Sequence, residues 1–88
     1  MMAAPLSELS PYASARHFFG AEVRLRRVAA GLSQAHLAQQ VLTDPSMVNK
    51  VELARRFPSA DLATRCDAVL NAGGALINAF LLQAQRAC

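Results

Sequence analysis

The chain has 88 residues and a formal net charge of +3; 53% of its residues are hydrophobic and 6% are aromatic. This length allows one domain, and a composition rich in Ala and Leu without alternating β-branched runs favours helices over strands. The two cysteines lack zinc-site spacing, and the chain has neither a signal peptide nor an apolar run long enough to cross a membrane, so we expect a cytoplasmic protein without metal or cofactor.

Residues 1–10 are predicted to form a flexible N-terminal arm, and residues 11–88 to form the folded domain. A Ser-Pro pair follows the arm and suits a helix start, so a first helix should begin between Pro11 and Gly20. It should end near Ala30, because the next residue is a glycine that can adopt the left-handed conformation found after many helices. Residues at helical spacing are expected to face inward: Phe19, Val23, Arg27 and Ala30.

Two short helices are predicted to follow. Ser33 is a good N-cap for a helix over 34–41, and Asp44 followed by Pro45 is a good start for a third helix. Between them lies a turn at residues 42–43 that is too short for anything but a close crossing of the two helices. Apolar residues at helical spacing should pack the pair from one side: Leu37, Ala38, Val41, Val48 and Val51.

The remainder of the chain is predicted to hold a basic loop and two more helices. The loop covers residues 54–58, and Ser59 caps a fourth helix over 60–70. A double glycine then separates this helix from a fifth one over 75–85. The fifth helix carries an apolar row that is wide enough to form a homodimer seam as well as to close the core: Leu76, Ile77, Phe80, Leu81 and Leu82.

Residues 33–52 carry the functional prediction. Their two helices resemble a helix-turn-helix, in which the outer face of the second helix is polar and free to enter a DNA major groove. Eight of the nine basic residues are Arg, whose fork suits phosphate and guanine. Asn49 and Lys50 lie on the second helix, and their chemistry suits adenine and guanine, respectively. The sequence therefore predicts a domain that binds double-stranded DNA.

The stretch GLSQAHLAQQ, followed by SMVNKVE and ARRFPS, resembles the helix-turn-helix of the xenobiotic-response-element-like (XRE) family, to which the lambdoid phage repressors belong. The wider pattern, from FFGAEVRLRR to NAGGALINAF, is similar to actinobacterial transcriptional regulators. The resemblance implies an all-α fold: a compact, lambda repressor-like bundle of about five helices around a central helix-turn-helix.

The resemblance also implies roles for particular residues. It places base-reading side chains at Ser46, Met47, Asn49 and Lys50. It places contacts with the DNA backbone at Ser33, Gln34, Arg55 and Arg56, with Gln34 also bracing the recognition helix. Arg27 and Glu52 match a buried structural ion pair that ties the first helix to the end of the third.

Several residues depart from the family pattern. Leu42 stands where the turn normally has Gly, so this turn either strains a Leu or takes another conformation. Ala54 also replaces a common Gly, and Pro45 replaces a polar base reader and can contribute only shape. In the first helix, Leu25 and Val28 occupy positions that are usually charged, so we expect them to form exposed apolar surface.

These features together predict a transcriptional regulator that binds a specific sequence, as a repressor-type homodimer on an inverted repeat in the bacterial nucleoid. An enzyme is not expected, because no nucleophile, acid–base pair or phosphate loop falls on neighbouring elements. The alternative function is a protein-interaction module, such as an antitoxin or a regulator controlled by a partner protein, which the positive mean hydropathy favours. Relatives of this kind usually continue into a further C-terminal domain.

Overall fold

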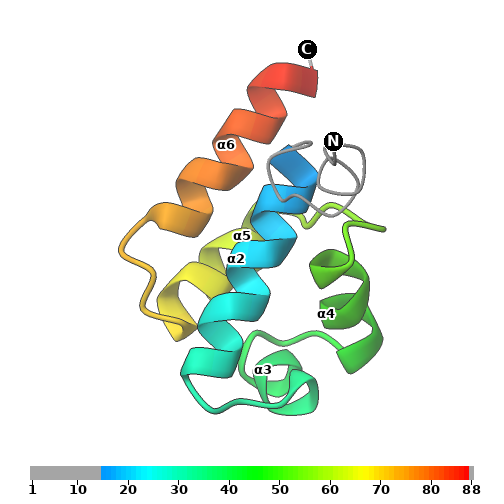
Figure 1. Ribbon diagram of the computed structural model, residues 1–88, viewed down its shortest axis with the longest axis vertical. Coiled ribbons are helices and arrows are strands. Elements are labelled where there is room, and N and C mark those ends of the chain that lie inside the picture. Colours follow the sequence, from blue (N-terminus) through cyan, green and yellow to red (C-terminus); the bar gives the residue numbers. More distant parts are fainter. Residues whose placement is uncertain (1–14, 88) are drawn as a thin grey trace, which may run out of the picture.

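The computed structural model describes residues 15–87, which form α-helices and no strand (Figure 1). The helices are α2 (Ala15–Ala29), α3 (Gln34–Gln40), α4 (Pro45–Glu52), α5 (Ala60–Val69) and α6 (Ala75–Ala87). The predicted all-α class with about five helices is therefore confirmed. The predicted arm at residues 1–10 and the predicted Ser-Pro helix start lie outside the described residues. None of the described helices is long and apolar enough to span a membrane.

Side-chain caps fix where three of the helices begin. The Ser33 hydroxyl oxygen accepts a hydrogen bond from the main-chain N–H of His36 at 3.0 Å, and Asp44 and Ser59 cap α4 and α5 in the same way. Each cap satisfies one of the N–H groups that a first helical turn leaves without a partner. Pro45 is the first residue of α4, a position at which no main-chain N–H is needed.

The core is built from small and medium apolar side chains of every helix. Its largest fully buried members are Phe19, Val23, Leu37, Val41 and Leu76. The predicted inward stripe of α2 is correct at Phe19 and Val23 but wrong at Ala30, which is exposed. The reason is that α2 ends at Ala29, so Ala30 no longer continues the helical stripe.

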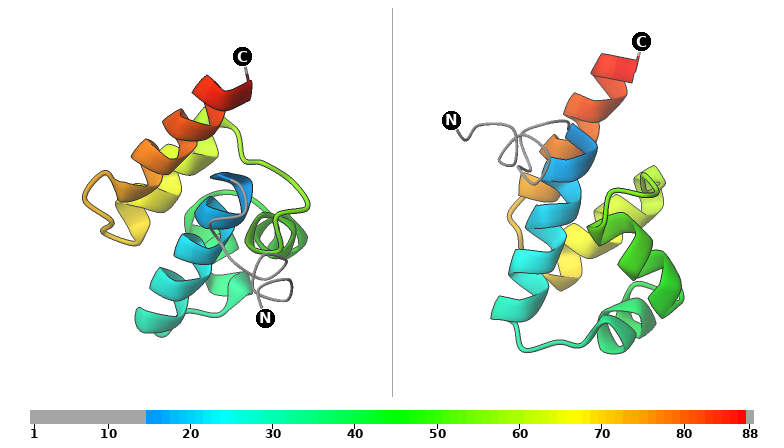
Figure 2. Two further views of the ribbon diagram at one scale, coloured as in Figure 1. Left: turned by 45° about the horizontal axis from the view of Figure 1, so that its top comes forward. Right: turned by 45° about the vertical axis from the view of Figure 1, so that its right-hand side comes forward.

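Helix α2 lies at the centre of the arrangement. It packs against α6 on one side and α4 on the other, while α6 also packs against α5 and α4 against α3 (Figures 1 and 2). Gly20 makes the contact with α4 close, because a Cβ atom at this position would overlap the carbonyl oxygen of Val51. The approach of α2 to α4 thus depends on the absence of a side chain at residue 20.

A buried carboxylate attaches α6 to α5. The side chain of Asp67 accepts hydrogen bonds from the main-chain N–H groups of Gly74, Leu76 and Ile77, at 3.0, 3.0 and 3.2 Å. These donors surround the start of α6, so Asp67 caps this helix from a neighbouring one. The cap satisfies the carboxylate, which is 7% exposed.

The turn between α3 and α4 keeps the backbone conformation of a glycine. Leu42 has φ of +62°, and Ala54 after α4 has the same value. Of the two alternatives for Leu42, the strained left-handed turn is therefore the one observed. The main-chain N–H of Thr43 donates to the carbonyl of Ala38 at 2.9 Å, and this bond closes the turn. The Leu42 side chain is 77% exposed and adds little packing in return.

Replacing Leu42 with Gly should stabilise the domain. A left-handed residue with a Cβ atom costs the folded state about 1–2 kcal/mol, and Leu42→Gly removes this cost. Gly also has more conformational freedom in the unfolded chain, which cancels part of the benefit. We therefore expect the free energy of unfolding to rise by about 0.5–1 kcal/mol. Urea unfolding followed by circular dichroism measures it. Leu53→Gly is the matched control, since Leu53 is also exposed but has φ of −87°. It should lose about 0.5–1 kcal/mol; losses in both variants would contradict strain at Leu42.

Candidate nucleic-acid interface

Helices α3 and α4 form the predicted helix-turn-helix. Leu37 and Ala38 of α3 are buried with Val48 and Val51 of α4, and these contacts hold the two helices together. At about 100° per residue, the exposed residues of α4 lie on the side opposite Val48 and Val51. The outward residues are Ser46, Asn49, Lys50 and Leu53. Exposing this face leaves α4 free to contact a ligand.

Three of the four predicted base-reading residues are on that outward face. The fourth, Met47, is half-buried and packs against the core at the edge of the face. Its thioether is thus shared between the core and the rim of the interface. Leu53 was not predicted, although it is 50% exposed at the end of α4. Leu53 lies on the same side of the helix as Ser46 and Lys50, but its apolar type alone gave no signal that it belongs to an interface.

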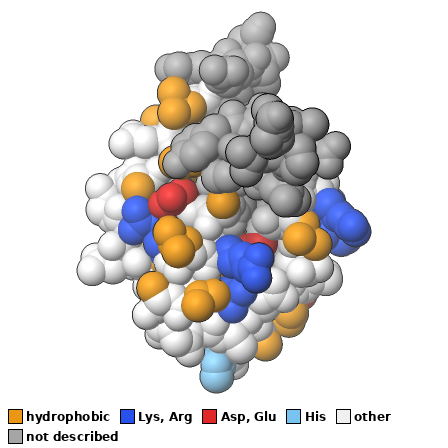
Figure 3. All heavy atoms as spheres, in the orientation of Figure 1, with side chains coloured by type: hydrophobic (Ala, Val, Ile, Leu, Met, Phe, Trp, Pro, Cys, Tyr) orange, Lys and Arg blue, Asp and Glu red, His pale blue; other side chains and the backbone are white. Residues whose placement is uncertain are grey.

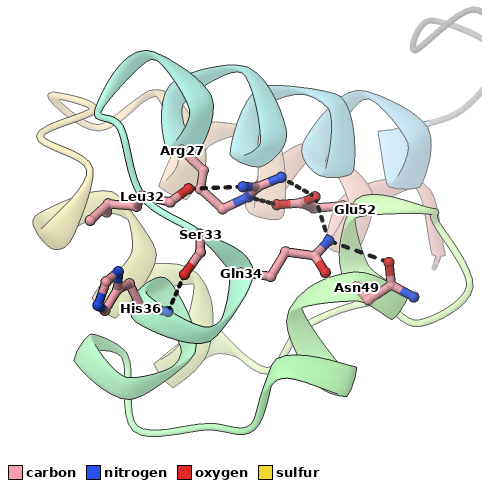
Figure 4. Close-up of polar contacts among 7 residues, drawn as sticks. All are labelled: Arg27, Leu32, Ser33, Gln34, His36, Asn49 and Glu52. Atoms are coloured by element: carbon pink, nitrogen blue, oxygen red, sulfur yellow. Dashed lines mark hydrogen bonds and ion pairs between the residues drawn. The ribbon is translucent and has the colours of Figure 1, made fainter.

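The predicted ion pair between Arg27 and Glu52 is present and joins α2 to α4 (Figure 4). Arg27 Nε donates to one Glu52 oxygen at 2.6 Å, and Nη2 donates to the other at 3.2 Å. Arg27 Nη1 also donates to the carbonyl oxygen of Leu32 at 2.9 Å. The two side chains are 12% and 3% exposed, so this is a forked and largely buried pair.

Gln34 extends this ion pair to the outward face of α4. Its Nε2 donates to Glu52 at 3.0 Å and to Oδ1 of Asn49 at 3.3 Å (Figure 4). Because a carboxylate only accepts, Glu52 forces Gln34 to present its NH₂ group, and Asn49 must then present its carbonyl oxygen to Gln34. The amide NH₂ of Asn49 is therefore the group left to face outward. The predicted bracing role of Gln34 is visible in these bonds.

The same bonds limit what Gln34 and Ser33 offer to a ligand. Both protons of the Gln34 amide are used within the protein, which leaves its main-chain N–H as the donor at the start of α3. The Ser33 hydroxyl oxygen accepts from His36, while its proton is free to donate. Both groups lie at the N-terminal end of α3.

Asp44 adds an exposed negative charge at the start of α4. Its carboxylate accepts a hydrogen bond from the Ser46 hydroxyl at 2.7 Å and from the main-chain N–H of Met47 at 2.9 Å. The Ser46 bond, followed by the Met47 bond, lowers the pKa of the Asp44 carboxyl. Ser46 therefore presents acceptor lone pairs outward while its proton is held by Asp44. The sequence indicated only a capping role for Asp44.

The basic loop after α4 lies beside a surface cleft. Arg55 and Arg56 are both exposed, and Arg56 lines a cleft of about 390 Å³ together with Met47 and Arg65. Arg65 of α5 was not predicted as a site residue. Its Nε donates to the carbonyl oxygen of Val41 at 2.8 Å, which fixes the guanidinium at the end of α3. On the face shown in Figure 3, Lys and Arg side chains form separate groups with hydrophobic side chains scattered between them.

The thiol that the described residues contain lies in the core. Burial raises the pKa of the Cys66 thiol to about 11, so it stays protonated within the core. Within residues 15–87, no group of three His, Cys, Asp or Glu side chains is placed to hold a metal ion. The donors, acceptors and positive charges around α4 can bind a ligand by hydrogen bonds and charge alone.

A family model described as a helix-turn-helix domain matches residues 19–80. This range is more than half of the chain and includes α3 and α4, so the protein belongs to the helix-turn-helix domain family. The match is consistent with the XRE-like resemblance of the sequence. The family binds DNA and is typically non-enzymatic. Comparisons with curated proteins and with solved structures find no match.

Breaking the Arg27–Glu52 pair should strongly destabilise the domain. Arg27→Met leaves the Glu52 carboxylate buried without its cation, so we expect a loss of about 3–5 kcal/mol in the free energy of unfolding. Glu22→Gln is the control, because Glu22 and Arg26 form a partly exposed ion pair between neighbouring turns of the same helix. It should change stability by no more than about 0.5 kcal/mol. Urea unfolding measures both, and equal losses would contradict a structural role for the buried pair.

Proposed function

We propose that the protein binds a specific double-stranded DNA sequence through α4 and regulates transcription. The observation that carries this proposal is the outward face of α4, where Asn49 and Lys50 are exposed and belong to no core contact. A major groove accepts one helix whose outer side chains reach base edges. The exposed Arg residues of the loop that follows α4 supply the positive charge that phosphate contacts need.

The proposed base-reading residues are Ser46, Met47, Asn49 and Lys50. Lys50 is the exposed cation of α4, and its ammonium group suits the N7 and O6 acceptors of guanine. Asn49 offers its NH₂ group, whose expected partner is the N7 acceptor of a purine, adenine included. Ser46 offers acceptors, and the methyl end of Met47 suits a thymine methyl group.

The proposed backbone contacts lie on both sides of these readers. Ser33 donates through its hydroxyl and Gln34 through its main-chain N–H at the start of α3. Arg55 and Arg56 contact phosphate from the loop after α4. Phosphate contacts of this kind position the recognition helix, while the side chains of α4 select the sequence.

We further propose that two copies bind an inverted repeat as a repressor-type dimer, in the manner of XRE-family regulators, at the bacterial nucleoid in the cytoplasm. Two recognition helices then enter successive major grooves about 34 Å apart. Leu81 and Leu82 of α6 support this arrangement, because both are exposed and can form an apolar seam.

An in vitro selection from random duplex DNA tests the proposal. We expect an enriched inverted repeat, and we expect Lys50→Ala to lose about 1–3 kcal/mol of binding free energy and to relax the preference at one base pair per half-site. Arg56→Ala is the comparison variant, because a phosphate contact should weaken binding to all sequences alike. If Lys50→Ala lost the same binding free energy on all sequences, Lys50 would be assigned to a contact with the DNA backbone. If the protein showed no salt-sensitive binding to any duplex, the proposed function would be overturned.

The second candidate function is a protein-interaction module, such as an antitoxin or a regulator controlled by a partner protein or by a further domain. The predicted exposure of Leu25 and Val28 is confirmed at 64% and 60%, and this apolar surface favours the alternative. Sedimentation velocity over a range of protein concentrations provides the test. A strictly monomeric protein at all concentrations would count against it, whereas association that Leu25→Glu abolishes would support it.

A further inference from the structure

A second cleft, the cleft between α2 and α4, lies on the other side of α4 and also borders the start of α3. Its volume is about 210 Å³, and its lining comes from three helices and the residue that follows α4: Arg24, Arg27, Gln34, Asn49, Glu52 and Leu53. Arg27 and Gln34 both donate hydrogen bonds to Glu52, and these three residues form its fixed wall (Figure 4). Arg24 and Asn49 complete the cleft at the surface.

This cleft carries one positive charge that no ion pair within residues 15–87 neutralises. Arg27 and Glu52 balance each other as an ion pair. Arg24 is exposed and takes part in none of the ion pairs formed within residues 15–87, unlike Arg26, which pairs with Glu22 at 3.1 Å. The Asn49 amide adds a second donor, because its carbonyl oxygen is held by Gln34. The groups that remain for a ligand are donors and a cation, which suit an anion with oxygen acceptors.

The two clefts lie on opposite sides of the recognition helix. Met47 borders the cleft of Arg56 and Asn49 borders the cleft of Arg24, and these two residues are roughly 200° apart around the axis of α4. A helix in the major groove, which is about 12 Å wide, has one phosphate backbone on each side. A positive cleft on each side of α4 therefore matches the two strands of a duplex.

We propose that the cleft between α2 and α4 binds a DNA backbone phosphate, with Arg24 as its principal donor, on the strand opposite the one that Arg55 and Arg56 contact. This inference rests on the proposed DNA binding and adds a contact from α2, outside the helix-turn-helix. The Arg27–Glu52 pair and Gln34 hold the wall of the cleft in place, so the phosphate contact and the base-reading face share one support.

Salt-dependent DNA binding of Arg24→Gln and Arg26→Gln tests the proposal. Both variants remove one positive charge from α2, but only Arg24 lines the cleft, and Arg26 is already paired with Glu22. We expect Arg24→Gln to reduce the slope of log K against log salt by about 0.9 for each bound copy, which corresponds to the loss of one phosphate contact per half-site. Arg26→Gln should keep the slope of the unmodified protein, and Arg24→Lys should restore it. Circular dichroism of each variant checks that the helices remain.

Neutral methylphosphonate linkages, placed singly along each strand of the selected site, identify the phosphate. In each half-site, the unmodified protein should lose affinity at one linkage to which Arg24→Gln is indifferent. Within that half-site, this linkage should lie on the strand opposite the one found with Arg56→Gln. An unchanged slope for Arg24→Gln, or an equal reduction for Arg26→Gln, would overturn this inference alone. Absence of salt-dependent binding by the unmodified protein would instead overturn the proposed function, and this inference with it.

Discussion

The ion pair between Arg27 and Glu52 fixes where α4 stands relative to α2. Two charges that are this far removed from water must be held by several hydrogen bonds, because an unpaired buried charge costs several kcal/mol. Arg27 meets this requirement with bonds to both Glu52 oxygens and to the Leu32 carbonyl, and Gln34 supplies another donor to Glu52. The same bonds set the direction of the Asn49 amide, so the packing of the bundle reaches the outward face of the recognition helix.

The backbone accepts local strain to preserve this arrangement. Leu42 and Ala54 both have positive φ, although only Gly adopts this conformation without cost. They flank α4, so any other conformation at either residue would redirect the recognition helix. The tight contact at Gly20 acts from the opposite side, where the missing side chain lets α2 approach Val51. Packing of α4 against α2 and α3 offsets the strain of the two turns.

Aromatic contacts connect the basic loop to the rest of the domain. Phe57 follows the two exposed Arg residues, stacks on Phe80 of α6 with ring centres 5.2 Å apart, and meets Phe19 edge-on at 5.9 Å. The loop is thus anchored to the core immediately after Arg56, while α6 is itself anchored by Asp67. The position of the loop therefore depends on α6 through the contact between Phe57 and Phe80.

The sequence by itself determined the helices and the caps of α3, α4 and α5, because these depend on residues that lie within about four positions of one another. The cap of α6 comes from Asp67 on a neighbouring helix, so it was decided by the tertiary structure. The family resemblance added the Arg27–Glu52 pair. Tertiary structure alone decided the exposure of Ala30, the half-burial of Met47 and the different surroundings of Arg24 and Arg26. It also decided which atoms of Asn49 face outward. Gln34, 15 residues away, holds the carbonyl oxygen of Asn49, and the orientation of the Gln34 amide is set by Glu52, 18 residues from it. Charge and donor direction depend on such distant neighbours, which hydrophobic periodicity does not encode.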